Sequence, residues 1–130
     1  SRPGLVATAA ELGDQYRADG VTLLHGDFYP GSWLRTADGI KVIDPEFGYL
    51  GACEFDLGVF LAHLHVSGYS AEDCSQALNA YARPFDTTAT DRFAGVEIMR
   101  RLIGVGQLPL DRSLAQKEAL LSLAERLMRS

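Results

Sequence analysis

Three carboxylates stand at two turns of this chain, each just after a short apolar run. Asp27 ends the segment His25-Gly26-Asp27, and Asp44 and Glu46 flank Pro45. Phosphoryl transfer to a hydroxyl needs an acidic residue that orients the hydroxyl and a Mg²⁺ ion that bridges phosphate oxygens. Mg²⁺ usually takes one or two protein carboxylates and fills its other positions with phosphate oxygens and water. The spacing therefore suits metal-assisted phosphoryl transfer.

Roles for these carboxylates follow from their local geometry. Pro45 biases Asp44 towards an extended backbone, in which residues two apart point to the same side. We therefore expect Asp44 and Glu46 to bind one metal ion. Asp27, on the neighbouring turn, would accept or orient the proton of the substrate hydroxyl, and it is the candidate catalytic base.

Other polar residues have structural interpretations, and several have a functional one as well. His25 is interpreted as a structural residue that satisfies nearby backbone groups, although it could act as a base. Ser32 could contact the metal directly or through water, or be an ordinary turn residue. Asp56 has a simple role as an acid in the first turn of a helix. Arg100 and Arg101 could bind phosphate or polar substrate groups, or form a solvated helix face, because adjacent helical residues diverge by about 100°.

The surrounding pattern predicts an α+β fold, with a few short strands and then four helices. Asp38-Gly39 is a strong hairpin signal, so the chain should return and bring Asp44 close to Asp27. Trp33 and Phe47 are predicted core aromatics. The expected elements are a helix over 5–18, strands over 21–24, 32–36 and 40–43, and helices over 54–66, from Ser70 to before Pro84, over 90–105, and from Asp111 or Ser113 onward.

Composition excludes several classes of protein. The chain has 130 residues, the usual size of one domain, and a formal net charge of −5 without a run of basic residues. General nucleic-acid or anionic-membrane binding needs clustered positive charge and is not expected. No apolar run approaches the roughly 20 residues that cross a bilayer, so we expect a cytoplasmic protein. Cys53 and Cys74 lack metal-ligand spacing and are predicted to be reduced, partly buried thiols.

These motifs together resemble those of one family. The chain is similar to the C-terminal lobe of small-molecule kinases of the aminoglycoside phosphotransferase and choline kinase superfamily, and within it to the 5-methylthioribose kinases. The resemblance implies a protein-kinase-like catalytic lobe that uses ATP and Mg²⁺ to phosphorylate methylthioribose or another sugar. It implies a catalytic role for Asp27, cofactor binding for Ser32 in Gly31-Ser32, metal binding for Asp44 and Glu46, a helix opening at Phe55-Asp56-Leu57-Gly58, and sugar binding for Arg100 and Arg101.

Two departures from the family pattern qualify this resemblance. Phe28-Tyr29 replaces the Leu-His that methylthioribose kinases carry after the catalytic aspartate, so the substrate could differ. The sequence also lacks the Gly-rich loop, the strand lysine and the helix glutamate of a nucleotide-binding N-terminal lobe. We therefore expect residues 1–130 to form one catalytic lobe that binds ATP weakly and turns over slowly or not at all by itself.

The sequence is also compatible with two alternatives. The first is another kinase of the same superfamily, acting on an aminoglycoside, choline or homoserine. The second is a non-catalytic, pseudokinase-type interaction module that exposes its former inter-lobe surface. Such a surface should be apolar, and it would be covered by the missing lobe or by self-association.

Overall fold

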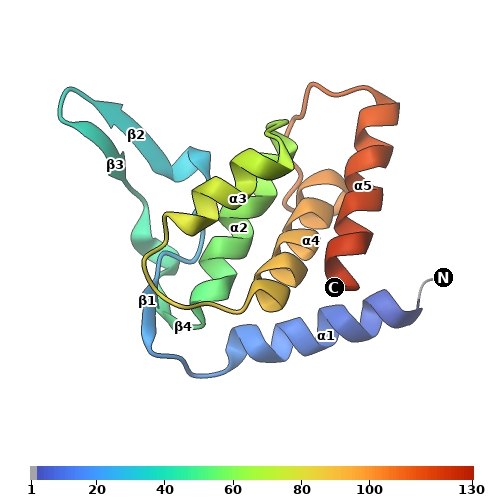
Figure 1. The fold of residues 1–130 in the computed structure, drawn as a ribbon, viewed down its shortest axis with the longest axis horizontal. Helices are drawn as coiled ribbons and strands as arrows, with labels where there is room; N and C mark the ends of the chain where they lie inside the picture. Colours follow the sequence, from blue (N-terminus) through green and yellow to red (C-terminus); the bar gives the residue numbers. More distant parts are fainter. Residues whose placement is uncertain (1–2) are drawn as a thin grey trace.

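The computed structural model describes residues 3–130 and is mostly helical, with four short strands at one end (Figure 1). This confirms the expected α+β composition. The elements in chain order are α1 (Pro3–Arg17), β1 (Thr22–Leu24), the 3₁₀ turn η1 (Pro30–Ser32), β2 (Trp33–Thr36), β3 (Gly39–Val42), the 3₁₀ turn η2 (Pro45–Phe47), β4 (Tyr49–Gly51), α2 (Cys53–Val66), α3 (Ala71–Asn79), α4 (Thr87–Ile103) and α5 (Leu114–Met128).

Side-chain caps set where three of the helices begin. Ser70 and Asp73 form a reciprocal capping box at α3, and Ser113 forms the predicted one at α5 with Gln116. At α4 the side chain of Asp86 accepts a hydrogen bond from the amide of Ala89. The helix therefore begins three residues earlier than the apolar spacing predicted, because the cap satisfies its first turn.

The strands form two separate antiparallel pairs. β2 and β3 make the predicted hairpin, and Gly39 at its turn has a φ of 111°, which favours glycine. β1 pairs with β4, a strand that the sequence pattern did not predict, and Leu23 lies opposite Leu50. The second pair places the residues that follow β1 beside the residues that precede β4.

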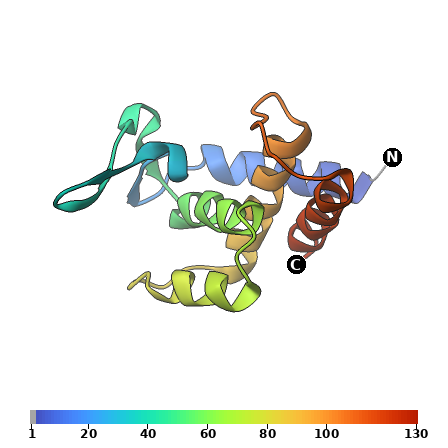
Figure 2. The same cartoon turned by 90° about the horizontal axis from the view of Figure 1, so that it is seen from above.

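A helical layer forms the core and supports these strands. α2 and α4 pack closely along their lengths, α5 covers the other side of α4, and α1 lies across one end of the layer (Figures 1 and 2). Ile98 and Ala94 of α4 are fully buried, and Leu12 of α1 is nearly so. The central cluster contains Leu57, Leu61, Ala62, Val66, Cys74, Leu78, Ala94, Ile98 and Ala124.

The two cysteines agree with the sequence-based expectation, and Phe47 does not. Cys53 and Cys74 are free thiols, half-buried and buried respectively, as predicted. Phe47 was expected in the core, but 60% of it is exposed, so that prediction was wrong. Its place in the short turn η2 leaves much of the ring at the surface instead of inside the helical core.

Across residues 3–130, no helix combines the length and apolar character needed to span a membrane.

Candidate active site

The loop that carries Asp27 is held by a carboxylate at the start of α2. Asp56 accepts hydrogen bonds from the backbone N–H of His25 at 2.6 Å and of Gly26 at 3.1 Å. Burial raises the pKa of Asp56, and the two hydrogen bonds act in the opposite direction. Asp56 lies in the first turn of α2, as predicted. It also fixes the backbone immediately before Asp27, a contact that the sequence did not predict.

The imidazole of His25 connects this loop to the end of the hairpin. The backbone N–H of Asp27 lies 3.2 Å from Nδ1, and Nε2 lies 2.7 Å from the carbonyl oxygen of Ile43. A backbone N–H can only donate, so Nδ1 accepts and Nε2 carries the proton that it donates to Ile43. His25 thus has the structural role that the sequence indicated, and the turn of Asp27 contacts the turn of Asp44.

Glycine is required at position 26 for two reasons. Its φ is 85°, and a Cβ placed there would overlap the carbonyl oxygen of Phe47. A side chain would therefore strain the backbone and separate the two turns.

Ser32 lies beneath the loop. It is 2% exposed, and its hydroxyl donates to the carbonyl oxygen of Asp27 at 2.9 Å. Its own carbonyl accepts from the N–H of Ile43 at 2.8 Å. Ser32 closes the loop around Asp27, and its cofactor contact stays a prediction.

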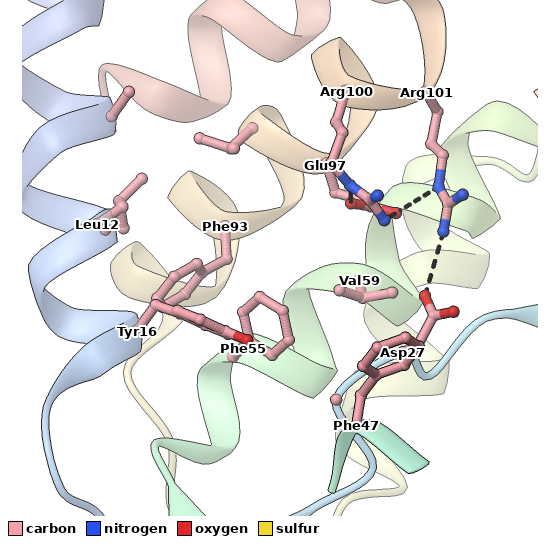
Figure 3. A pocket seen from close by; sticks show the side chains of 14 residues that line it. Leu12, Tyr16, Asp27, Phe47, Phe55, Val59, Phe93, Glu97, Arg100 and Arg101 are labelled. Carbon is pink, nitrogen blue, oxygen red and sulfur yellow. Dashed lines mark hydrogen bonds and ion pairs between the residues drawn. The ribbon is translucent and has the colours of Figure 1, made fainter. Parts of the chain in front are cut away.

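Arg101 of α4 reaches across to the candidate base. Its Nη2 donates to Oδ1 of Asp27 at 3.2 Å, and its Nε donates to Oε1 of Glu97 at 2.7 Å (Figure 3). Arg100 donates to the same carboxylate, from Nε at 2.7 Å and from Nη2 at 3.1 Å. Although adjacent helical residues diverge, a carboxylate three and four residues earlier can pair with both. The two arginines therefore meet at one site with Asp27.

Glu97 is the buried centre of this cluster. Burial by itself would raise the pKa of Glu97, but hydrogen bonds from His63, Arg100 and Arg101 outweigh it and bring the pKa to about 2. His63 of α2 contributes Nε2 at 3.3 Å, and the ring of Tyr29 lies under the Arg101 guanidinium, 4.7 Å from ring centroid to Cζ. Sequence patterns did not indicate Glu97, His63 or Tyr29 as site residues, although the spacing of Glu97 before the arginine pair was a usable signal.

Asp44 and Glu46 do not have the geometry expected of them. Asp44 adopts a left-handed conformation with φ 59° and ψ 53°, and Pro45–Phe47 is a 3₁₀ turn. The argument that an extended segment points both carboxylates to one side was therefore wrong. Aspartate tolerates this backbone region better than most residues, and such conformations occur often at functional turns.

The metal-binding role of these two residues remains a prediction. Both are exposed, and no group of three or more His, Cys, Asp or Glu side chains within residues 3–130 could enclose a metal ion. Two exposed carboxylate donors still match the need of Mg²⁺, which completes its shell with phosphate oxygens and water.

A cavity of about 430 Å³ opens beside Asp27, between α1, α2 and α4. Figure 3 shows apolar side chains from these helices on one side and the polar cluster on the other. The apolar lining includes Leu12, Tyr16, Phe55, Val59 and Phe93, and the polar end consists of Asp27, Glu97, Arg100 and Arg101. The arrangement can hold a small molecule with one apolar part and several hydroxyl groups.

Curated proteins similar to this chain are kinases of small molecules. Specifically, they are methylthioribose kinases. The protein from Exiguobacterium sibiricum is 44% identical over 64 residues, and that from Geobacillus kaustophilus is 43% identical over 65 residues. Methylthioribose kinase 1 from Oryza sativa is 37% identical over 70 residues. No protein-family profile matches the sequence.

The similarity covers part of each protein. It includes 49%, 50% and 54% of this chain, respectively, and 16% of each of the three relatives. The chain thus resembles methylthioribose kinases, as the motifs indicated, and the matched segment spans about one sixth of their length.

Proposed function

We propose that this chain is the C-terminal, catalytic lobe of a kinase-like enzyme that works in the cytoplasm. It would transfer the γ-phosphoryl group of ATP to a hydroxyl of a small polar metabolite, with methylthioribose as the first candidate. The observation that carries this proposal is the position of Asp27, which lies at the polar end of a cavity whose other walls are apolar. A sugar hydroxyl and a thioether group would suit these two environments.

The roles of the residues follow from their positions. Asp27 would accept the proton of the attacking hydroxyl, with its carboxylate oriented by the hydrogen bond from Arg101. Arg100 and Arg101 would position the sugar, and Ser32 would bind the cofactor from the catalytic loop. Asp44 and Glu46 would hold Mg²⁺, which supplies charge neutralisation to the phosphates.

The nucleotide-binding lobe would come from residues outside this sequence. Its docking surface would include Ile40 and Val42, which share one face of the hairpin, and the paired Leu23 and Leu50 of β1 and β4, each more than half exposed. The same side chains favour the second candidate, a non-catalytic module that self-associates through this surface. Light scattering over a range of protein concentrations separates the two, because only the second requires a stable oligomer of this chain.

The decisive experiment measures Mg²⁺-dependent ADP release with methylthioribose, ribose, choline, homoserine and an aminoglycoside as acceptors. The chain is tested alone and together with the nucleotide-binding lobe of a methylthioribose kinase. We expect activity with methylthioribose only when that lobe is present, and a loss of at least about a hundredfold in Asp27→Asn. Activity that survives this substitution would show that Asp27 is not the base.

A further inference from the structure

The charges of the arginine cluster are balanced inside the protein. The side chain of Glu97 is 6% exposed and pairs with both Arg100 and Arg101, while Asp27 pairs with Arg101 from the other side. Two guanidinium groups thus face two carboxylates, and the formal sum is zero while the imidazole of His63 is uncharged. The polar end of the cavity therefore offers many hydrogen-bonding groups without a net charge.

This balance affects which ligands can enter. The side chain of Arg100 is 43% exposed and lines the cavity, and two unpaired arginines in such a place would attract a phosphate group. Here the Nε atoms of both arginines are occupied by Glu97. A neutral polyol can still form hydrogen bonds with the remaining N–H donors and with the carboxylate of Asp27. An anion gains little electrostatic attraction there.

We propose that Glu97 is a specificity-determining residue: its buried carboxylate, lying between Arg100 and Arg101 at the polar end of the cavity, selects an uncharged polyhydroxyl acceptor over a phosphorylated sugar. This inference rests on the proposed function and deepens it. Transfer of a phosphoryl group turns a neutral acceptor into a dianion, so the same balance weakens the retention of the product. Glu97 would thereby set both the entry of the substrate and the release of the product.

The expected size of the effect follows from Coulomb's law. For a dianionic phosphate about 6 Å from Glu97 and an effective dielectric constant of about 40, removal of one negative charge strengthens binding roughly a hundredfold. A substitution that merely disturbed the fold would weaken every ligand, so a gain in anion affinity is a specific sign of the proposed role.

The test uses Glu97→Gln in this chain, with calorimetric titration of inorganic phosphate, ribose 5-phosphate and methylthioribose at pH 8. Glu118→Gln is the matched control, because Glu118 is an exposed residue of α5 and its substitution changes the net charge equally. We expect Glu97→Gln to bind both phosphates about a hundredfold more tightly and methylthioribose less tightly, with no change in the control. Unchanged phosphate affinity in Glu97→Gln, or an equal gain in Glu118→Gln, would overturn the proposal.

A second variant covers the case in which Glu97→Gln does not fold. Asp27→Asn removes the other negative charge of the cluster at a side chain that is 28% exposed, and it should also raise phosphate affinity. No gain there would refute the charge balance. Failure of the unmodified chain to bind methylthioribose would refute the proposed substrate, while the phosphate titrations would still decide the role of Glu97.

Discussion

Replacing Asp56 with alanine should loosen the loop that carries Asp27 while leaving the helical core intact. In the folded protein this carboxylate accepts the backbone N–H groups of His25 and Gly26, at 2.6 and 3.1 Å. The substitution leaves both donors without an acceptor in a half-buried place. The loop therefore loses the connection to the start of α2 that these two amides make.

The free-energy change can be approximated from these contacts. A hydrogen bond to a charged group contributes about 1.5–3 kcal/mol. Water reaches part of this site, and removing the carboxylate also removes the desolvation that raises the pKa of Asp56. Both effects reduce the loss, so we expect the free energy of unfolding to fall by about 2–3 kcal/mol rather than by the full sum of two such bonds.

Urea denaturation followed by circular dichroism measures this loss, and amide hydrogen exchange locates it. The exchange protection of His25 and Gly26 should fall more than that of buried Ile98 in α4. Asp111→Ala, at an exposed residue, is the control and should change the unfolding free energy by less than about 0.5 kcal/mol. If Asp56→Ala behaves like the control and both amides stay protected, the anchoring role is refuted.

Three further predictions can be checked by the same urea denaturation. Gly26→Ala should lower the free energy of unfolding by about 3 kcal/mol, because backbone strain adds to overlap with a carbonyl oxygen. Gly39→Ala should lower it by about 1–2 kcal/mol, because φ is positive there but the space around it is open. Equal losses in the two variants would contradict this reasoning. Ile98→Ala should lower the free energy of unfolding by about 4 kcal/mol, since the side chain is fully buried. A loss below about 1 kcal/mol would show that the core closes around the cavity that the substitution leaves. The pKa of Glu97 lies at about 2 in the folded protein, below its ordinary 4.5, so its stabilising contribution is complete above pH 4.5 and is lost as the pH falls towards 2. Glu97→Gln should flatten the stability curve in this window, and an unchanged slope would show that other carboxyl groups cause it.

Features that depend on neighbouring residues could be predicted from the sequence. The hairpin at Asp38-Gly39 and the capping box of Ser113 with Gln116 involve residues at most a few positions apart, and both occur as expected. The first helix and the strand before Asp27 were also predicted with nearly correct boundaries. Backbone propensity and side-chain caps act within one or two turns, so their signals can be detected in a short window.

The tertiary structure decided which distant groups meet. Arg101 and Asp27 are separated by 74 positions, and His25 and Asp56 by 31, so no local pattern could place them within hydrogen-bonding distance. Asp44 adopts a left-handed backbone instead of the extended one that Pro45 favours, where the chain turns between the end of the hairpin and β4.

The sequence by itself therefore determined the helices, the hairpin and the chemical types available at the two turns. Only the packing of the helices and of the loop that Asp56 holds decided that Arg101 meets Asp27 and that a cavity opens beside them. The physical reason is that local backbone preferences act between neighbouring residues, whereas burial of the apolar faces of α2 and α4 sets the distances between side chains far apart in the chain.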